Sequence, residues 1–407
     1  MILWILPVMF FAISPMLNDA TTLLRSGIIS LIPLLYVLLR PIKIKKYFML
    51  LVVFILINLS LIISWYVNKQ EIYSFLVGSY GRNLGLLALN GLFLISFIFA
   101  NKIINNEFGL IKSIYITIIV AQAYGIIQYF NLDPLDWADK SFKIPLTLGN
   151  PNFSSAFLGI TSLVPLYYFM RYKKKIRFLN LAVYLISGFL ILNTQSSQGF
   201  IIYILNLLLF IIINNIKVLK KYLKTAQLFT VIFLSSILTI ILIQALTFKT
   251  MFDALSNAIN LQDRLNHWSL AWRMFSDKPW SGFGFGDQQK YSAEYLNFED
   301  AKKWGNYLQP DKAHSVPFDY FVGAGLVAGL SYIFFITLIF YYVYKISRFT
   351  ITVGDSDFVK LIGLTWGCYV FQTLFSPSHI YLDLIGFVLA GSIIGIYFKY
   401  KETKITK

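Results

Sequence analysis

Apolar and polar residues alternate in long blocks along this chain. Apolar runs of about 17–25 residues are each long enough to cross the roughly 30 Å hydrocarbon core of a bilayer as an α-helix. About twelve such runs are present, at residues 1–17, 21–39, 47–66, 84–101, 110–130, 153–170, 178–194, 199–214, 226–246, 317–344, 358–376 and 383–398. The pattern predicts an all-α polytopic membrane protein with about 12 transmembrane helices.

One polar segment, residues 247–316, interrupts this succession of apolar runs. It is rich in aromatic residues and carries basic and acidic residues together, whereas the other gaps are short. The pattern therefore predicts three parts. These are transmembrane helices 1–9 in residues 1–246, a large extracytoplasmic loop with short helices in residues 247–316, and transmembrane helices 10–12 with a short cytoplasmic tail in residues 317–407.

The composition favours a membrane protein over a soluble one. Of the 407 residues, 57% are hydrophobic and only 13% are charged, whereas a soluble domain has about 25% charged residues. The first apolar run lacks a basic N-terminal region and a small-residue cleavage site, so we expect a retained helix rather than a signal peptide. The single cysteine, Cys368, excludes an internal disulfide.

The formal net charge of +16 indicates topology rather than nucleic-acid binding, because the basic residues gather in alternate loops. These basic clusters lie within residues 40–46, 171–177, 217–224, 345–360 and 399–407. The positive-inside rule places these loops and both termini in the cytoplasm. It places segment 247–316 on the outer side, which we therefore expect to carry the active face.

Within the large loop, residues 261–276 have helical periodicity. An aromatic and apolar stripe recurs every three or four residues and consists of Leu265, Trp268, Trp272 and Phe275. With Arg264 beside the stripe, such a helix suits the membrane interface, and the alternative is a loop helix packed on the bundle without a ligand. The glycines of WSGFGFGD, residues 280–287, permit tight turns. Without a preceding strand they predict a structural turn and not a dinucleotide site.

Ionisable residues beside the apolar runs gather at the predicted outer ends. They are Arg25, Arg82, Asp319 and Asp383, together with the histidines His267, His314 and His379. Charges at the bilayer boundary are costly and often mark a functional site, so the set favours a site on the outer face. The alternatives are that the arginines only extend to lipid headgroups and that His314 is a polar residue capping the next helix.

Five stretches of the sequence resemble the O-antigen ligase and polymerase superfamily, membrane glycosyltransferases that move a polyprenyl-diphosphate-linked glycan. They are GRNLGLL (81–87), LGNPNFSSAFLG (148–159), TQSSQGFI (194–201), RLNHWSLAWRMFSDKPWSGFGFG (264–286) and AHSVPFDYFVGAGLVAGL (313–330). The resemblance implies an undecaprenyl-diphosphate-linked oligosaccharide donor, a lipid A core or growing glycan as acceptor, membrane lipids as partners, and neither a cofactor nor a nucleic acid. It also implies the bacterial inner membrane as location, with the active face toward the periplasm.

The family motifs fall on particular residues of this chain. Arg264 matches the loop arginine that the family uses on the donor diphosphate, and His314 matches the histidine implicated in catalysis at the start of the next helix. Arg82 resembles an outer-end arginine common in these proteins. The chain departs from the family at two positions. Gln198 stands where the family usually has the arginine of Ser-Arg-Gly, and Ser315 stands where it usually has the asparagine of His-Asn.

These residue types suit the departure of a diphosphate from a sugar. Guanidinium groups bind phosphate oxygens in pairs and stay charged, so Arg264 and Arg82 are the predicted diphosphate ligands. A neutral imidazole with a pKa of about 6.5 makes His314 the predicted proton acceptor, and direct displacement would invert the anomeric configuration. The further predicted substrate-binding residues are Arg25, Gln198, Trp268, Asn150 and Asn152.

Other mechanisms and functions stay open at this point. The only candidate metal cluster is the acidic turn of Asp133, Asp136 and Asp139, which no histidine accompanies, so we predict a metal-independent enzyme. A lipid-linked glycan flippase or other polytopic transporter is the alternative function, although the predicted helix centres carry no charge. An inactive scaffold is a further alternative because of Gln198. Ligase and polymerase both fit these residues.

Overall fold

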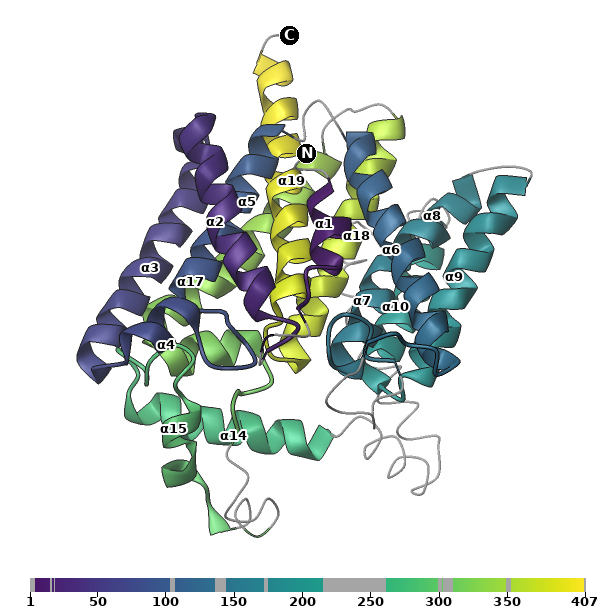
Figure 1. Cartoon of the computed structure of the whole chain (residues 1–407). Coiled ribbons are helices and arrows are strands. Elements are labelled where there is room, and N and C mark those ends of the chain that lie inside the picture. The colour runs from purple at the N-terminus through teal and green to yellow at the C-terminus, as the bar shows by residue number, and fades with distance from the viewer. Residues whose placement is uncertain are drawn as a thin grey trace.

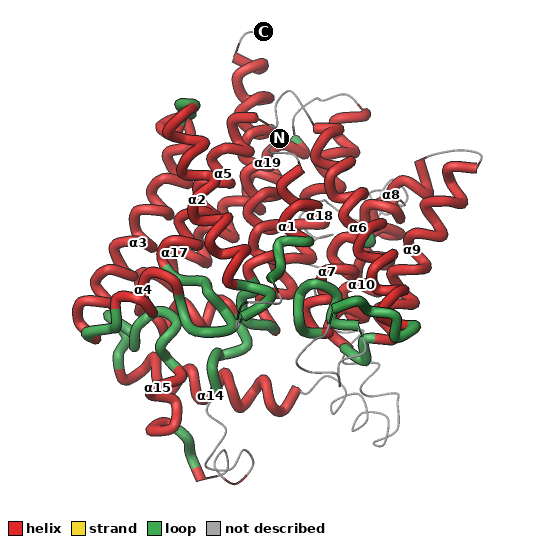
Figure 2. The backbone as a smooth tube through the Cα atoms, viewed as in Figure 1, coloured by secondary structure: helices red, strands yellow, loops and turns green. Residues whose placement is uncertain are grey.

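The computed structural model describes residues 4–14, 17, 19–102, 107–135, 144–171, 175–214, 261–298, 302, 310–348 and 353–405. Within these residues every regular element is a helix and no strand occurs (Figure 2). The predicted all-α class is therefore confirmed. The cytoplasmic or extracytoplasmic placement of each end stays a prediction.

The helices follow one another along the chain as labelled in Figure 1. They are α1 (Ile5–Phe10), α2 (Leu23–Leu39), α3 (Phe48–Asn68), α4 (Ile72–Val77), α5 (Leu86–Lys102), α6 (Glu107–Tyr129), α7 (Pro151–Thr161), α8 (Leu163–Arg171), α9 (Lys175–Asn193), α10 (Ser197–Asn214), α14 (Leu261–Asp277), α15 (Gln289–Ser292), α17 (Val316–Ser347), α18 (Val353–Phe375) and α19 (Ile380–Ile405), with the 3-10 helices η2 (Ile44–Tyr47) and η4 (Ala293–Tyr295).

In the described residues, 6 helical segments are long and apolar enough to cross a membrane. They are Ile44–Asn68, Gly109–Tyr129, Lys175–Asn193, Val316–Ser347, Phe358–Phe375 and Ile380–Glu402. Shorter apolar helices are Leu23–Leu39, Leu86–Lys102 and Ser197–Leu209. The chain is thus a multi-pass membrane protein, and its described residues account for fewer spans than the twelve that the apolar runs predict.

Three of the predicted apolar runs need comment. Run 1–17 contributes α1, whose 6 residues rise only about 9 Å, too short to span a bilayer as one helix. Run 153–170 is divided between α7 and α8 at Ser162, whose hydroxyl donates to the carbonyl oxygen of Gly159. Run 226–246 lies outside the described residues.

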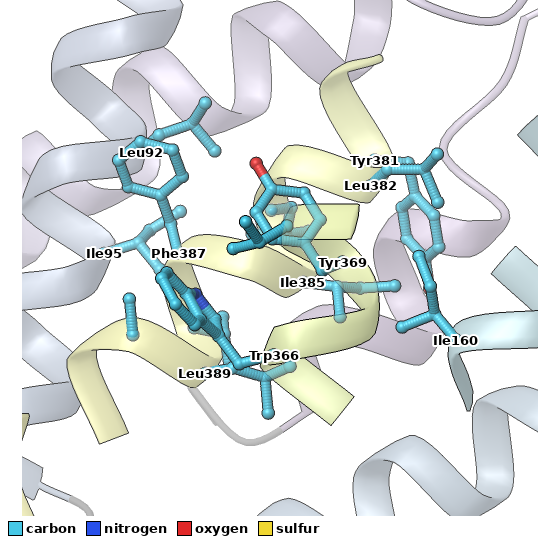
Figure 3. Close-up of a cluster of buried hydrophobic side chains, with 14 of the residues drawn as sticks. Leu92, Ile95, Ile160, Trp366, Tyr369, Tyr381, Leu382, Ile385, Phe387 and Leu389 are labelled. Atoms are coloured by element: carbon cyan, nitrogen blue, oxygen red, sulfur yellow. The ribbon is translucent and has the colours of Figure 1, made fainter. Parts of the chain in front are cut away.

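Helix α19 forms the centre of the bundle (Figure 1) and is almost wholly buried. It packs closely along α5, where a Cβ on Gly391 would overlap the main-chain carbonyl of Ser96. The Ser96 hydroxyl donates to the carbonyl oxygen of Phe387 at 2.7 Å. Aromatic rings fill the space around this contact, among them Phe387 and Trp366 (Figure 3). A helix that is apolar on all sides is stable only in such a central position or against lipid.

Helix α17 is interrupted near its N-terminal end. Gly325 has φ +80 and ψ −173 inside the helix, so hydrogen bonds of the regular helix are lost there. The main chain of the glycine-rich loop segment replaces them. Phe283 N donates to Val322 O at 2.9 Å, and Leu326 N donates to Pro279 O at 2.7 Å. The predicted structural turn at 280–287 therefore acts as a main-chain partner for the broken helix.

Helix α14 lies across one end of the bundle, over the start of α17 (Figure 1). Its buried side chains are Leu270, Ala271 and Met274, which form a small apolar core with Phe283, Ala313 and Val322. The predicted stripe is only partly the packing face, because Leu265 and Trp272 are exposed. The apolar residues of α14 surround more than one side of the helix, so periodicity alone did not select the buried one.

We expect Gly325→Ala to destabilise the fold, since a left-handed non-glycine residue costs about 1–2 kcal/mol and the new Cβ would overlap the main-chain carbonyl of Trp280. Thermal unfolding in detergent should show a lower Tm. Gly27→Ala is the matched control, because no atom lies within 4 Å of a Cβ built there. An equal Tm for both variants would contradict this account of the break in α17.

Candidate functional site

The first feature of the site is the fixed backbone around His314. Ser315 is the N-cap of α17, and His314 itself has φ +52, a left-handed conformation that histidine adopts more readily than most residues. The Asp319 carboxylate holds the preceding residue, because Ala313 N donates to its Oδ1 at 2.9 Å. Gln288 Nε2 donates to the same oxygen at 2.9 Å. The imidazole of His314 is thereby presented from a constrained turn at the helix start, where the sequence predicted it.

A second imidazole lies against the first. The rings of His267 and His314 have centroids 4.5 Å apart at an interplanar angle of 62°. His267 stands one helical turn after Arg264 on α14, so both side chains leave the same side of that helix. The predicted pair of Arg264 and His314 is therefore brought together by the docking of α14 on α17.

The electrostatics of His314 reflect this crowding. Its pKa is lowered to about 3, chiefly by burial and also by the charges of His267, Arg264 and Arg82, while Asp311 opposes the shift. An imidazole among cations binds a proton poorly. His314 is therefore neutral at any ordinary pH, which is the protonation state that a proton acceptor needs.

Arg82 comes from the turn between α4 and α5, and its closest partner is Asp311. Its Nε and one terminal nitrogen donate to the same oxygen, Asp311 Oδ2, at 2.9 and 2.7 Å. Burial would raise the pKa of Asp311, but the guanidinium of Arg82 and its hydrogen bond outweigh burial and hold that pKa below its usual range. The guanidinium also lies 5.7 Å from the ring centre of Phe153. Arg82 thus links the start of α17 to the start of α7.

The two predicted asparagines cap α7 rather than form a separate cluster. Asn150 is the N-cap, and its side chain accepts a hydrogen bond from Asn152 N at 2.8 Å. One turn on, Ser155 Oγ donates to Ser196 Oγ at 2.9 Å, which ties the start of α7 to that of α10. Gln198 lies in this first turn of α10, buried, and its Nε2 has no hydrogen-bond partner among the described residues.

Arg264 and Trp268 line the α14 side of the site. Burial lowers the pKa of Arg264, and the neighbouring Asp263 opposes that shift. The Trp268 ring lies 6.2 Å from the ring of Phe318 and 5.7 Å from that of Phe375, measured between centroids. Its Nε1 is buried without a hydrogen-bond partner among the described residues. These two side chains stay predicted substrate ligands.

The contacts of Arg25 indicate a structural role for its side chain. Its side chain is fully buried, and its nitrogens donate to main-chain oxygens of Met9, Phe10 and Thr21 at 2.8–2.9 Å and to Thr147 Oγ1 at 3.0 Å. The carbonyls of Met9 and Phe10 lie at the end of α1, where a continued helix would use them. Arg25 therefore fixes the turn after α1, and its predicted contact with diphosphate gains no support from these bonds.

Sequence reasoning assigned no role to three neighbours of His314. They are Asp311 and Lys312, which it did not consider, and His267, which it placed only among the ionisable residues of the predicted outer face. Lys312 is buried, with its ammonium 5.3 Å from the ring centre of Phe285. Burial lowers its pKa, and the charges of Asp319 and Asp311 oppose that shift. The signals available were the run Asp-Lys-Ala-His and the spacing of three between Arg264 and His267.

A small cavity lies beside this site, among α5, α17, α18 and α19. Its lining combines apolar residues with a polar group and consists of Leu84, Leu89, Leu92, Phe285, Val316, Tyr320, Tyr332, Tyr369, Ser378, Asp383 and Phe387. The Tyr369 hydroxyl donates to Asp383 Oδ1 at 2.9 Å. The cavity is lined by Val316, which lies in the first turn of α17 after His314.

Potential metal ligands are dispersed in the part of the chain that the structure describes, where no three His, Cys, Asp or Glu side chains could hold one ion. Asp133 is engaged as a structural acceptor. It receives hydrogen bonds from the Tyr124 hydroxyl at 2.9 Å, Gln128 Nε2 at 2.7 Å and Leu135 N at 3.0 Å. The other two members of the predicted acidic turn, Asp136 and Asp139, lie outside the described residues.

We expect Arg82 and Asp311 to be energetically coupled. In a double-mutant cycle of Arg82→Gln, Asp311→Asn and the double variant, the coupling should be about 0.5–1 kcal/mol, as for a partly exposed ion pair. Free energies of unfolding in mixed micelles with increasing SDS would measure it. Additive effects of the two substitutions would show that the ion pair contributes nothing to the folded site.

Comparison with known proteins agrees with this geometry. A family model described as O-antigen ligase matches residues 182–333, a stretch that contains Gln198, Arg264 and His314 together with the break in α17. No curated protein matches the chain. The resemblance predicted from the sequence is confirmed over residues 182–333, where the chain is similar to the O-antigen ligase family.

Proposed function

We propose that this protein is a membrane glycosyltransferase of the O-antigen ligase or polymerase type. It would move a glycan from an undecaprenyl-diphosphate carrier to a sugar hydroxyl on a lipid A core or a growing glycan. The observation that carries the proposal is the convergence of Arg264 and Arg82 on His314 at one end of the bundle. The basic clusters in alternate loops support a periplasmic position for this end and a location in the bacterial inner membrane.

The arginines suit the donor diphosphate. As the bond from the anomeric carbon to the phosphate oxygen breaks, negative charge develops on the departing diphosphate, and cations placed there stabilise the transition state. Arg264 is largely buried and Arg82 half-buried, so their charges act in a partly desolvated site, where they are stronger. Gln198 can donate a hydrogen bond to the same group but adds no charge.

His314 suits the acceptor hydroxyl. In the proposed reaction the hydroxyl oxygen bonds to the anomeric carbon from the face opposite the diphosphate, so the configuration inverts. The hydroxyl proton passes to the neutral imidazole of His314. Donor binding would improve this base, because the diphosphate offsets the charges of Arg264 and Arg82, which lower the pKa of His314. The base would thus become competent when the donor is in place.

The direct test is donor-dependent glycan transfer by the purified protein in vesicles that contain the lipid-linked oligosaccharide and an acceptor glycolipid. We expect a longer or newly glycosylated acceptor and release of polyprenyl diphosphate. A flippase would instead relocate the lipid-linked glycan chemically unchanged. That outcome, or no reaction at any acceptor concentration, would contradict the proposed function.

His314→Ala should lower the transfer rate about 10²–10⁴-fold, the usual contribution of a positioned proton acceptor. The exposed Arg177→Gln, on α9, is the control for expression and reconstitution. Single-turnover transfer measured with saturating donor separates the chemical step from donor binding. A His314→Ala rate equal to that of the unaltered protein would remove the proposed role of this imidazole.

Transfer should also continue unchanged in the presence of EDTA, since the proposed stabilisation of the diphosphate comes from guanidinium groups. The measurement is the initial rate after dialysis against the chelator, with and without added Mg²⁺. A rate that falls on dialysis and returns with Mg²⁺ would contradict the metal-independent mechanism.

A further inference from the structure

His267 is a titratable neighbour of His314 to which the proposed reaction assigns no role. It comes from α14, 47 residues earlier in the chain (314 − 267), and its ring packs against that of His314 with centroids 4.5 Å apart. Its Nδ1 lies 2.5 Å from the carbonyl oxygen of Asp263. A carbonyl oxygen only accepts, so Nδ1 carries the proton in this contact.

We propose that His267 is a positioning residue for His314, and that the two imidazoles form a dyad that takes up at most one proton beyond its neutral form, on His267. This inference rests on the proposed function, because it gives His314 its protonation state as the acceptor of the hydroxyl proton. The dyad keeps that acceptor neutral in acidic surroundings. The ring of His267 also fixes the orientation of the His314 ring by packing directly against it.

The charged groups around the dyad decide which ring takes the first proton. The groups that face His314 are His267 and Arg264 from α14, Arg82 from the turn before α5, and Asp311 from the segment before α17. The groups that face His267 are Asp263, Asp311 and Arg264. Apart from each other, His314 therefore meets two guanidinium groups and one carboxylate, whereas His267 meets one guanidinium group and two carboxylates.

His267 has the more favourable surroundings for a proton. Burial lowers its pKa, but the hydrogen bond to the Asp263 carbonyl and the charges of Asp263 and Asp311 favour its charged form. Once His267 is charged, a second proton on His314 would place two imidazolium rings in contact. Like charges at such a distance suppress the second protonation. The order is therefore His267 first and His314 only at much lower pH.

The dyad has a consequence for the fate of the transferred proton. When His314 takes the proton of the acceptor hydroxyl, the imidazolium that forms is disfavoured beside His267 and Arg264. The departing diphosphate, which gains charge as its bond to the sugar breaks, would be able to accept that proton. The proton then leaves with the diphosphate, and His314 returns to its neutral form without help from solvent.

Carbethoxylation by diethyl pyrocarbonate tests the dyad without an activity assay, because the reagent attacks the neutral imidazole. The chain has only three histidines, so peptide mass spectrometry resolves His314. For the unaltered protein we expect the reactivity of His314, corrected with free imidazole, to persist below pH 5. In His267→Phe, which keeps an aromatic ring but not the charge, the midpoint of the pH dependence of His314 reactivity should rise by about one pH unit or more.

His267→Lys is the matched variant, because it restores a positive charge without the ring. We expect its His314 midpoint to stay as low as in the unaltered protein. The proposal is overturned if His267→Phe keeps the original midpoint, if His267→Lys rises as far as His267→Phe, or if the unaltered protein already titrates near pH 6.5. The last criterion needs no variant and so does not depend on variant folding.

A parallel pH profile of glycan transfer separates the dyad from the proposed function. We expect the acidic limb of the rate to move toward neutral pH in His267→Phe. If His267→Phe transfers glycan and the acidic limb of its pH profile does not move, the dyad is wrong and the proposed glycosyltransferase function stands. If no transfer occurs at any pH but the carbethoxylation midpoint shifts as expected, the dyad stands and the proposed reaction is wrong.

Discussion

The main-chain pairing between the glycine-rich loop and the broken α17 is the contact on which the half of the molecule that carries α14 depends. A helix break in an apolar setting exposes peptide groups whose desolvation costs several kcal/mol each if they stay unpaired. Here Phe283 N and Gly284 N donate to Val322 O and Gly323 O, and Leu326 N donates to Pro279 O. The same bonds fix the segment that follows α14. The pairing of this loop with the broken α17 therefore also positions α14, so that Arg264 and His267 lie over His314.

The charged site works against stability unless a ligand fills it. Buried or half-buried cations converge on His314, and burial lowers the pKa of both Arg264 and Lys312. Charges that are costly in the folded protein persist where function requires them. Asp311 and Asp319 offset part of the positive charge within the site, which lets the protein fold before any anion arrives. An incoming diphosphate would complete that compensation.

The fold was more accessible from the sequence than the site. Long apolar helices follow from local composition, because each satisfies its own main-chain hydrogen bonds. Run 1–17 departs from this rule, because the side chain of Arg25, which lies on α2, donates hydrogen bonds to the main-chain carbonyls at the end of α1. Arg264 and His314 were predicted through the family resemblance. The pairing of Arg82 with Asp311, 229 residues apart, leaves no mark in local periodicity, and neither does the contact of His267 with His314.

The absence of an arginine at Gln198 changes how the remaining cations must be used. Arg82 is bound to Asp311 in this state through a single carboxylate oxygen, and the side chain of Asp311 is 37% exposed. An ion pair so open to water is worth no more than about 1 kcal/mol, so a diphosphate with several acceptor oxygens can displace the carboxylate from Arg82. The freed Asp311 would stay close to His314 and raise its affinity for a proton. In the proposed reaction, this one exchange of partners would supply the donor with a second cation and make the neighbouring imidazole a better base.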